Sequence, residues 1–296
     1  MGRLYVWLKR HMRTAVQFCF TALTNGYAAG FVKGSIWKGS SKTFCVPGLN
    51  CYSCPGALGA CPIGSFQAVL ADRNYKFAFY VAGFLMLVGA VLGRFVCGWL
   101  CPFGLVQDLL YKIPFVKKLR RLPGDRWLKY LKYFILVGFV IVLPLTVLDI
   151  VGQGEPWFCK YICPSGTLFA GIPLVASNSM LQSAVGWLFA WKAGILAVLV
   201  LLSILVYRPF CRYLCPLGAV YGLFNPIAFY RYEIDADLCT KCGKCQRACK
   251  LDIPVYKTPN SPECIRCGDC RRACPHGAVC TTFHRETQQK KGDMEA

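Results

Sequence analysis

The sequence predicts an α-helical membrane domain (residues 1–229) with four transmembrane helices and re-entrant cysteine segments. A small α+β domain (230–284) and a polar tail (285–296) follow. Charged residues form 16% of the 296 residues and hydrophobic residues 55%, whereas ordinary soluble domains are about a quarter charged. The long apolar runs all lie before residue 230, and regularly spaced cysteines mark the region after it. Composition and cysteine spacing therefore indicate two domains of different kinds.

Two cysteine runs in the C-terminal region share the spacing C-x2-C-x2-C-x3-C. This is the ligand spacing of a dicluster bacterial-type ferredoxin domain, in which the fourth cysteine of each run binds the other 4Fe–4S cluster. Zinc is the alternative, but zinc sites use cysteine pairs separated by long spacers. Lys250 stands where the first run would usually have proline, which affects the turn after Cys249 and not the ligand. The predicted sets are Cys239, Cys242, Cys245 and Cys274 for cluster 1, and Cys264, Cys267, Cys270 and Cys249 for cluster 2.

A second motif, C-x3-C-P-x-G, occurs three times in the apolar part, beginning at Cys97, Cys159 and Cys211. A looser copy runs from Cys54 to Cys61 and is preceded by Cys45 and Cys51. Disulfide bonds or free buried thiols are the alternative to cluster ligands. However, a C-x3-C disulfide closes too small a loop to stabilise a fold much. The Cys-Pro ending also repeats the C-terminal motif, and a chain with two clusters already receives iron and sulfide. We therefore interpret these motifs as further cluster ligands.

Four apolar runs predict membrane-spanning helices, each near the required length of about 20 residues. They are residues 14–32, 77–96, 134–151 and 185–207. The first is the most polar, and a cleaved signal peptide is its alternative because basic residues precede it. We expect it to be retained, since its loss would leave three spans.

The basic residues predict an orientation in the cytoplasmic (inner) membrane. Positive residues favour the inner side, which places the second connection, both termini and the C-terminal domain in the cytoplasm and the third connection outside. The net charge of +20 is thus explained by topology, and we expect no nucleic-acid partner. The first connection is placed outside although it is also basic. The second connection contains Lys112, Lys117, Lys118, Arg120, Arg121, Arg126, Lys129 and Lys132, opposed by Asp125 alone, whereas the third has Lys160 as its basic residue.

This orientation sorts the remaining motifs onto two faces. Cluster 3 at the cytoplasmic face would take Cys97, Cys101, Cys211 and Cys215, and cluster 4 outside would take Cys54, Cys61, Cys159 and Cys163, with Cys51 able to replace Cys54. In each motif, proline would end the preceding turn and glycine would permit a sharp reversal. The helix end would then fold back as a re-entrant element, although an ordinary helix stop is the alternative.

The order of spans, Cys-x3-Cys-Pro motifs, basic loop and double-cluster domain resembles the NapH family, roughly over residues 75–280. Those membrane ferredoxins pass quinol electrons towards periplasmic nitrate reductase. NosR-type proteins, which serve nitrous oxide reductase, and the CcoG/polyferredoxin group are similar. The resemblance implies that the motifs at Cys97 and Cys211 are the family's paired membrane motifs. The additional motifs at 51–61 and 159–163 depart from NapH, so the partner and the direction of electron flow do not carry over.

Other chemistries have little support in the sequence. Three histidines are too few and misplaced for paired haem ligands in the membrane, and C-x-x-C-H and nucleotide-binding motifs are absent. Cys19 and Cys280 are interpreted as incidental thiols. Asp149, Lys192 and Arg94 are interpreted as interface anchors or snorkelling residues near span ends rather than quinone ligands.

The predicted function is electron transfer through a chain of 4Fe–4S clusters. It would connect a quinone pool or external redox partner to a cytoplasmic partner, with quinone as a possible second cofactor. One alternative is a quinol dehydrogenase subunit without transmembrane electron flow, which would be part of an oxidoreductase. Another is a ferredoxin for metallocentre assembly or redox sensing. In each case we expect redox proteins or subunits of a membrane complex as partners.

Overall fold

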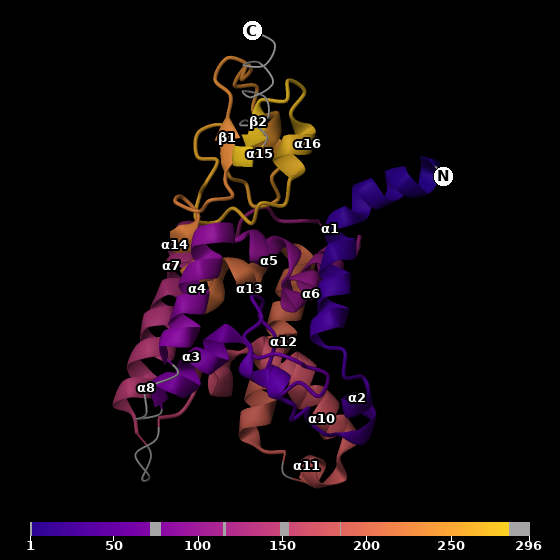
Figure 1. Ribbon diagram of the computed structural model, residues 1–296, viewed down its shortest axis with the longest axis vertical. Helices are drawn as coiled ribbons and strands as arrows, with labels where there is room; N and C mark the ends of the chain where they lie inside the picture. The colour runs from indigo at the N-terminus through magenta and orange to yellow at the C-terminus, as the bar shows by residue number, and fades with distance from the viewer. Residues whose placement is uncertain (1, 72–77, 115–116, 149–153, 184, 284–296) are drawn as a thin grey trace.

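The computed structural model describes residues 2–71, 78–114, 117–148, 154–183 and 185–283. The predicted polar tail, Asp149 and the ends of two predicted spans lie outside these residues. The cysteine-rich C-terminal domain forms one end of an elongated molecule, and helices form the remainder (Figure 1). The helical elements up to residue 146 are α1 (Gly2–Thr24), α2 (Ala29–Lys33), the short 3₁₀ turn η1 (Ser40–Thr43), α3 (Pro62–Ala71), α4 (Ala78–Leu92), α5 (Phe95–Trp99), α6 (Pro102–Tyr111), α7 (Asp125–Ile135), the π-helical segment η3 (Leu136–Val142) and α8 (Leu143–Thr146). Those that follow are the π-helical segment η4 (Phe158–Ile162), α9 (Pro164–Gly166), the π-helical segment η5 (Thr167–Gly171), α10 (Ile172–Ser177), α11 (Ser179–Ser183), α12 (Trp187–Leu205), α13 (Pro209–Tyr213) and α14 (Pro216–Phe224).

Two helices in the described part of the chain are long and apolar enough to cross a membrane. One is the continuous helix Asp125–Thr146, formed by α7, η3 and α8, and the other is α12. They correspond to the predicted spans 134–151 and 185–207. The predicted span 77–96 is interrupted, because Gly93 takes φ +52° between α4 and α5. The predicted span 14–32 is shifted, since α1 ends at Thr24.

The exposed surface of these helices is strongly apolar. Large hydrophobic side chains face outward along α4, the α7–η3 helix and α12, and they include Phe79, Leu87, Phe134, Val137, Val198 and Leu201. Soluble monomers rarely expose apolar surface on this scale. The pattern therefore favours association with a membrane.

The Cys-Pro-x-Gly segments differ in detail from the prediction. Cys101, Cys163 and Cys215 have extended backbone and each immediately precedes a helix whose first residue is proline. Proline thus starts the following helix, a position where its missing N–H costs nothing, rather than simply ending the previous turn. Gly104 takes no left-handed conformation. It packs closely instead, since an added Cβ would lie 3.1 Å from the carbonyl oxygen of Cys97. The predicted sharp reversal at glycine was therefore wrong, and close packing is the reason for the residue.

The C-terminal domain combines two short strands and two short helices. Strands β1 (Tyr232–Ile234) and β2 (Val279–Thr281) pair antiparallel, with Glu233 opposite Cys280, and each cysteine run contains one helix, α15 (Lys244–Ala248) or α16 (Asp269–Ala273). The basic connection before α7 lies against this domain, because Arg121 forms an ion pair of 2.6 Å with Asp252. The basic connection and the C-terminal domain therefore share one end of the molecule.

A buried ion-pair network attaches the C-terminal domain to the helices. Glu263 accepts from Arg94 at 2.9 Å and also pairs with Lys132. Arg94 and Lys132 are 1% and 0% exposed. Arg94 is therefore not the interface anchor that the sequence predicted. Burial alone would raise the pKa of Glu263, but the two cations outweigh burial and lower this pKa.

Removal of the Glu263 carboxylate should strongly destabilise this attachment. Glu263→Ala would leave two buried cations without their partner, at a cost of about 3–5 kcal/mol, measurable as a lower unfolding temperature in detergent. Glu155→Ala, which breaks the more exposed ion pair with Lys160, is the matched control and should change stability by less than about 1 kcal/mol. Equal effects of the two substitutions would contradict this account.

The same network predicts a pH dependence. Because the pKa of Glu263 is lowered in the folded protein, its contribution is present above the unfolded-state pKa of about 4.3. The contribution is lost as the pH falls through the folded-state pKa. The stability difference between wild-type and Glu263→Ala protein should therefore begin to shrink as the pH falls below about 4.3 and should vanish only below the folded-state pKa of Glu263, and a constant difference at all pH values would contradict the prediction.

Candidate cluster sites

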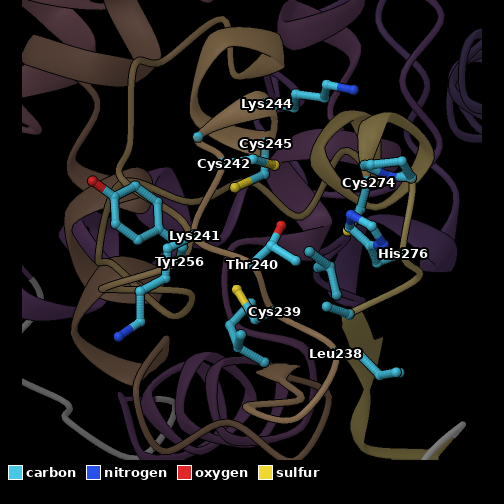
Figure 2. A pocket seen from close by; sticks show the side chains of 15 residues that line it. Leu238, Cys239, Thr240, Lys241, Cys242, Lys244, Cys245, Tyr256, Cys274 and His276 are labelled. Atoms are coloured by element: carbon cyan, nitrogen blue, oxygen red, sulfur yellow. The ribbon is translucent and has the colours of Figure 1, made fainter.

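The first C-terminal quartet surrounds one pocket. Cys239, Cys242, Cys245 and Cys274 all line it, together with Tyr256 and His276, and Figure 2 shows their side chains around it. Cys274 comes from the second run, so the fold brings the fourth cysteine of one run to the first three of the other. This arrangement matches the crossed ligand pattern that the spacing predicts.

The second quartet consists of Cys264, Cys267, Cys270 and Cys249. Burial and then the neighbouring Cys264, Cys267 and Cys249 raise the pKa of Cys270, and burial raises the pKa of Cys264. Several buried thiolates so close together repel one another and need a compensating cation. The iron of a cluster supplies such positive charge, so this donor set fits a 4Fe–4S cluster.

The two runs use the same local backbone. Lys241 and Arg266, the residues before the second cysteine of each run, have φ of 53° and 52°. Gly243 and Gly268, which precede α15 and α16, also have positive φ. This conformation is costly for residues with a Cβ, so its repetition at equivalent positions indicates that the two loops are built for the same purpose.

Four more cysteines meet where α5, α6, α13 and α14 come together. We call Cys97, Cys101, Cys211 and Cys215 the proximal site, because it lies next to the C-terminal domain. All four are buried, and they are close enough to interact electrostatically as one group. They come from two separate motifs, as the sequence predicted for cluster 3.

Two buried arginines join the halves of the proximal site, a role that was not predicted from the sequence. Arg94 donates to the carbonyl oxygen of Cys211 at 2.7 Å, and Arg208 donates to that of Cys97. Arg208 also forms an ion pair with Asp108, with Nε 2.7 Å from Oδ1. Each arginine stands three residues before the first cysteine of its motif, and this shared spacing was the signal in the sequence.

The proximal site is in direct contact with a C-terminal ligand loop. Asn225 donates to the carbonyl oxygen of Cys264 at 2.7 Å, and the indole of Trp99 donates to that of Arg266 at 3.0 Å. Gly98, inside the first proximal motif, packs so closely on the carbonyl oxygen of Ile265 that a Cβ would collide with it. The second quartet and the proximal site are therefore adjacent.

A fourth group of cysteines surrounds a cavity of about 690 Å³. Two of the helices that line it, α3 and α10, lie away from the C-terminal domain (Figure 1). We call its cysteines, Cys51, Cys61, Cys159 and Cys163, the distal site. They interact electrostatically with one another. Among the described residues, no three His, Cys, Asp or Glu side chains converge tightly enough for a single metal ion. The distal thiols ring a space, and four thiols around a space fit the ligand set of a 4Fe–4S cluster.

Cys54 lies apart from the distal cavity. Its Sγ lies 3.6 Å from the side-chain oxygen of Asn25, to which it donates, and it does not line the cavity that Cys51 lines. Cys51 Sγ also lies within 3.6 Å of the Cβ position at Gly166, in the motif of Cys163. The geometry thus favours Cys51 over Cys54, the ligand preferred from the sequence. The remaining cysteines are Cys19, Cys45, Cys54 and Cys280, and none of the twenty cysteines forms a disulfide bond.

The first connection reaches from the distal site to the proximal site. The backbone of Leu49 interacts with the side chain of Cys101, and a Cβ on Gly48 would lie 3.1 Å from Cys101 Cα. Tyr221 is fully buried and its hydroxyl donates to the carbonyl oxygen of Pro47 at 3.1 Å. The first connection therefore runs between the helices rather than over the surface of the molecule (Figure 1).

Comparison with known proteins agrees with the cysteine pattern. A family described as a 4Fe-4S binding domain matches three times, at residues 76–123, 131–175 and 186–229. An uncharacterized protein of Methanocaldococcus jannaschii is 29% identical over 58% of this chain and 64% of its own length. The methylamine utilization ferredoxin-type protein MauN of Paracoccus denitrificans is 28% identical, with coverage of 62% and 58%. The ferredoxin-type protein NapH of Haemophilus influenzae is 30% identical, with coverage of 61% and 56%.

These matches confirm the predicted resemblance to the NapH-like ferredoxin group and the prediction that the chain binds 4Fe–4S clusters. The chain spans between about half and two thirds of the length of these relatives. No solved structure gives a significant match.

Substitution of Cys51 and Cys54 should separate a ligand from a neighbouring thiol. Cys51→Ala should lower the iron content by about four atoms per chain, the content of one cubane cluster, because it removes a thiol from the distal site. Cys54→Ala is the matched control and should retain the iron. Anaerobic purification with iron and sulfide determination measures both, and the reverse result would assign the ligand to Cys54.

Proposed function

We propose that the protein carries electrons through the cytoplasmic membrane along four 4Fe–4S clusters. Four cysteine quartets in succession support this proposal, since the two C-terminal quartets exchange their fourth cysteines, Asn225 links the second quartet to the proximal site, and Tyr221 links the proximal site to the distal one. The proposed ligand sets are Cys239, Cys242, Cys245 and Cys274; Cys249, Cys264, Cys267 and Cys270; Cys97, Cys101, Cys211 and Cys215; and Cys51, Cys61, Cys159 and Cys163.

The chain itself supplies thiolates, spacing and charge. Each bound cluster supplies reversible one-electron chemistry. Arg94 and Arg208 hold the two proximal motifs together and bring positive charge close to Cys97 and Cys211. Positive charge stabilises the more negative, reduced state, so these residues favour electron acceptance at the proximal site.

The contacts between quartets support a continuous route. The backbone of Cys264 is tied to the proximal site through Asn225. Tyr221 interacts electrostatically with Cys97 and Cys101 of the proximal site and with Cys61 of the distal site. The buried ring of Tyr221 therefore fills the space between these two sites, which would otherwise be aliphatic or empty. We infer that electrons pass between the proximal and distal sites at Tyr221.

The proposed topology has four membrane crossings, with the C-terminal domain in the cytoplasm. The outward apolar surface of α4, the α7–η3 helix and α12 supports membrane insertion. The shared end of the basic connection and the C-terminal domain supports one cytoplasmic face. α4 and α5 together, and α1, would form the other two crossings.

A quinol dehydrogenase subunit is the second candidate, and the distal cavity favours it. At about 690 Å³ the cavity lies in the range of small-molecule sites, about 300–1,000 Å³. It is lined by Lys42 and Lys192 as well as the distal cysteines. A quinone that used this cavity would exchange electrons with the distal cluster without any electron crossing the whole membrane.

Anaerobic purification should distinguish the four-cluster proposal from a two-cluster protein. Wild-type protein should contain about sixteen iron atoms per chain, four for each cubane cluster. Cys101→Ala and Cys215→Ala should each remove the same spectroscopic signal and about four of these atoms, because they belong to one proximal set, while the C-terminal signals persist. About eight iron atoms in wild-type protein, with no loss on either substitution, would contradict the proposal.

A further inference from the structure

Two glutamines occupy equivalent places in the cysteine motifs. Gln67 and Gln107 each follow a Cys-Pro cysteine, Cys61 or Cys101, by six residues. They lie within the apolar helices α3 and α6 and are 0% and 1% exposed. Because a buried amide is unfavourable without hydrogen-bond partners, their partners indicate why they are there.

Both glutamines make the same pair of hydrogen bonds. Gln107 Nε2 donates to Cys211 Sγ at 3.1 Å, and its Oε1 accepts from the Phe210 backbone N–H at 3.2 Å. Gln67 repeats this arrangement. Its Nε2 donates to Cys159 Sγ at 3.4 Å, and its Oε1 accepts from the N–H of the preceding residue, Phe158, at 3.0 Å.

The chemistry of the partners fixes the direction of each amide. A backbone N–H can only donate, so the oxygen of each glutamine must face the phenylalanine. The NH₂ group then necessarily faces the neighbouring cysteine sulfur. The N–H···S hydrogen bond is therefore a consequence of the backbone contact beside it.

Each glutamine connects two motifs of one site. Gln107 reaches from the Cys101 motif to Cys211 in the proximal site, and Gln67 reaches from the Cys61 motif to Cys159 in the distal site. In the other two motifs the equivalent positions are aromatic, Phe169 and Tyr221. Each site thus has one sulfur that accepts from a buried side-chain amide, which a purely structural filler would not require.

We propose that Gln107 and Gln67 are positioning residues that raise the reduction potentials of the proximal and distal clusters. This inference rests on the proposed ligand sets. Hydrogen bonds to cluster sulfurs help to set the potential, because a donor stabilises the more negative, reduced state. The effect is strong in an interior of low dielectric.

Redox titration of anaerobically purified full-length variants tests the proposal. Gln107→Met has nearly the same length but no N–H donor, and it should shift the proximal midpoint potential to a more negative value at unchanged iron content. The Fe–S stretching frequencies of that centre should rise, since the lost hydrogen bond no longer weakens the iron–thiolate bond. Gln67→Met should do the same to the distal centre alone. Gln182→Leu, at an exposed position on α11, is the control and should shift no potential.

The outcomes separate this inference from the proposed function. Unchanged membrane-cluster potentials at full iron content, or equal shifts of both centres in either variant, would overturn the role of the glutamines. If a Met variant loses iron, the Gln→Asn variant at the same position is tested instead. The shorter amide cannot span both partners, so the same negative shift is expected, and no shift would again overturn the inference. Wild-type protein without proximal and distal signals would instead overturn the cluster assignment itself.

Discussion

The structure depends on how thiolates are compensated inside an apolar domain. Buried anions are unfavourable unless cations or donors accompany them, and this chain provides both from within its cysteine motifs. At the proximal site, Arg94 and Arg208 each reach across to the carbonyl oxygen of the other motif's first cysteine. Their carboxylate partners, Glu263 and Asp108, come from the C-terminal domain and from α6. Removal of either carboxylate would leave buried cations without their anionic partner, so the site, the helix packing and the attachment of the C-terminal domain form one network.

The distal site uses the same plan with weaker electrostatics. The glutamine bridge is repeated, but no arginine stands three residues before Cys159, where the chain has Pro156. Lys192 instead donates to the carbonyl oxygen of Cys159 at 3.1 Å. The ammonium of lysine is a point charge on a flexible side chain, so it compensates the thiolates less well than a planar guanidinium that bonds several groups at once. We infer that the proximal and distal clusters differ in potential because their surroundings differ in buried positive charge.

Much of the site could be predicted from the sequence, because cluster ligands obey strict local spacing. The crossed assignments of Cys249 and Cys274, and the pairing of the motifs at Cys97 and Cys211, follow from repeated patterns. The choice between Cys51 and Cys54 could not be predicted, since both lie in an irregular segment whose path depends on long-range contacts such as that of Leu49 with Cys101. The buried role of Arg94 was missed for a similar reason, because a span-end arginine usually snorkels to the interface. Its partner, Glu263, lies 169 residues away in the sequence.

The central claim is that electrons traverse the whole chain of sites, and vesicles that enclose a redox protein test it most directly. Purified protein is reconstituted into liposomes that contain a soluble haem protein, and a membrane-impermeant reductant is added outside. The account predicts that the enclosed haem is reduced with wild-type protein. Reduction should be slower with Tyr221→Leu and should be abolished with Cys163→Ala, which lacks a distal ligand. If all clusters become reduced while the enclosed haem stays oxidised, the protein does not carry electrons across the membrane.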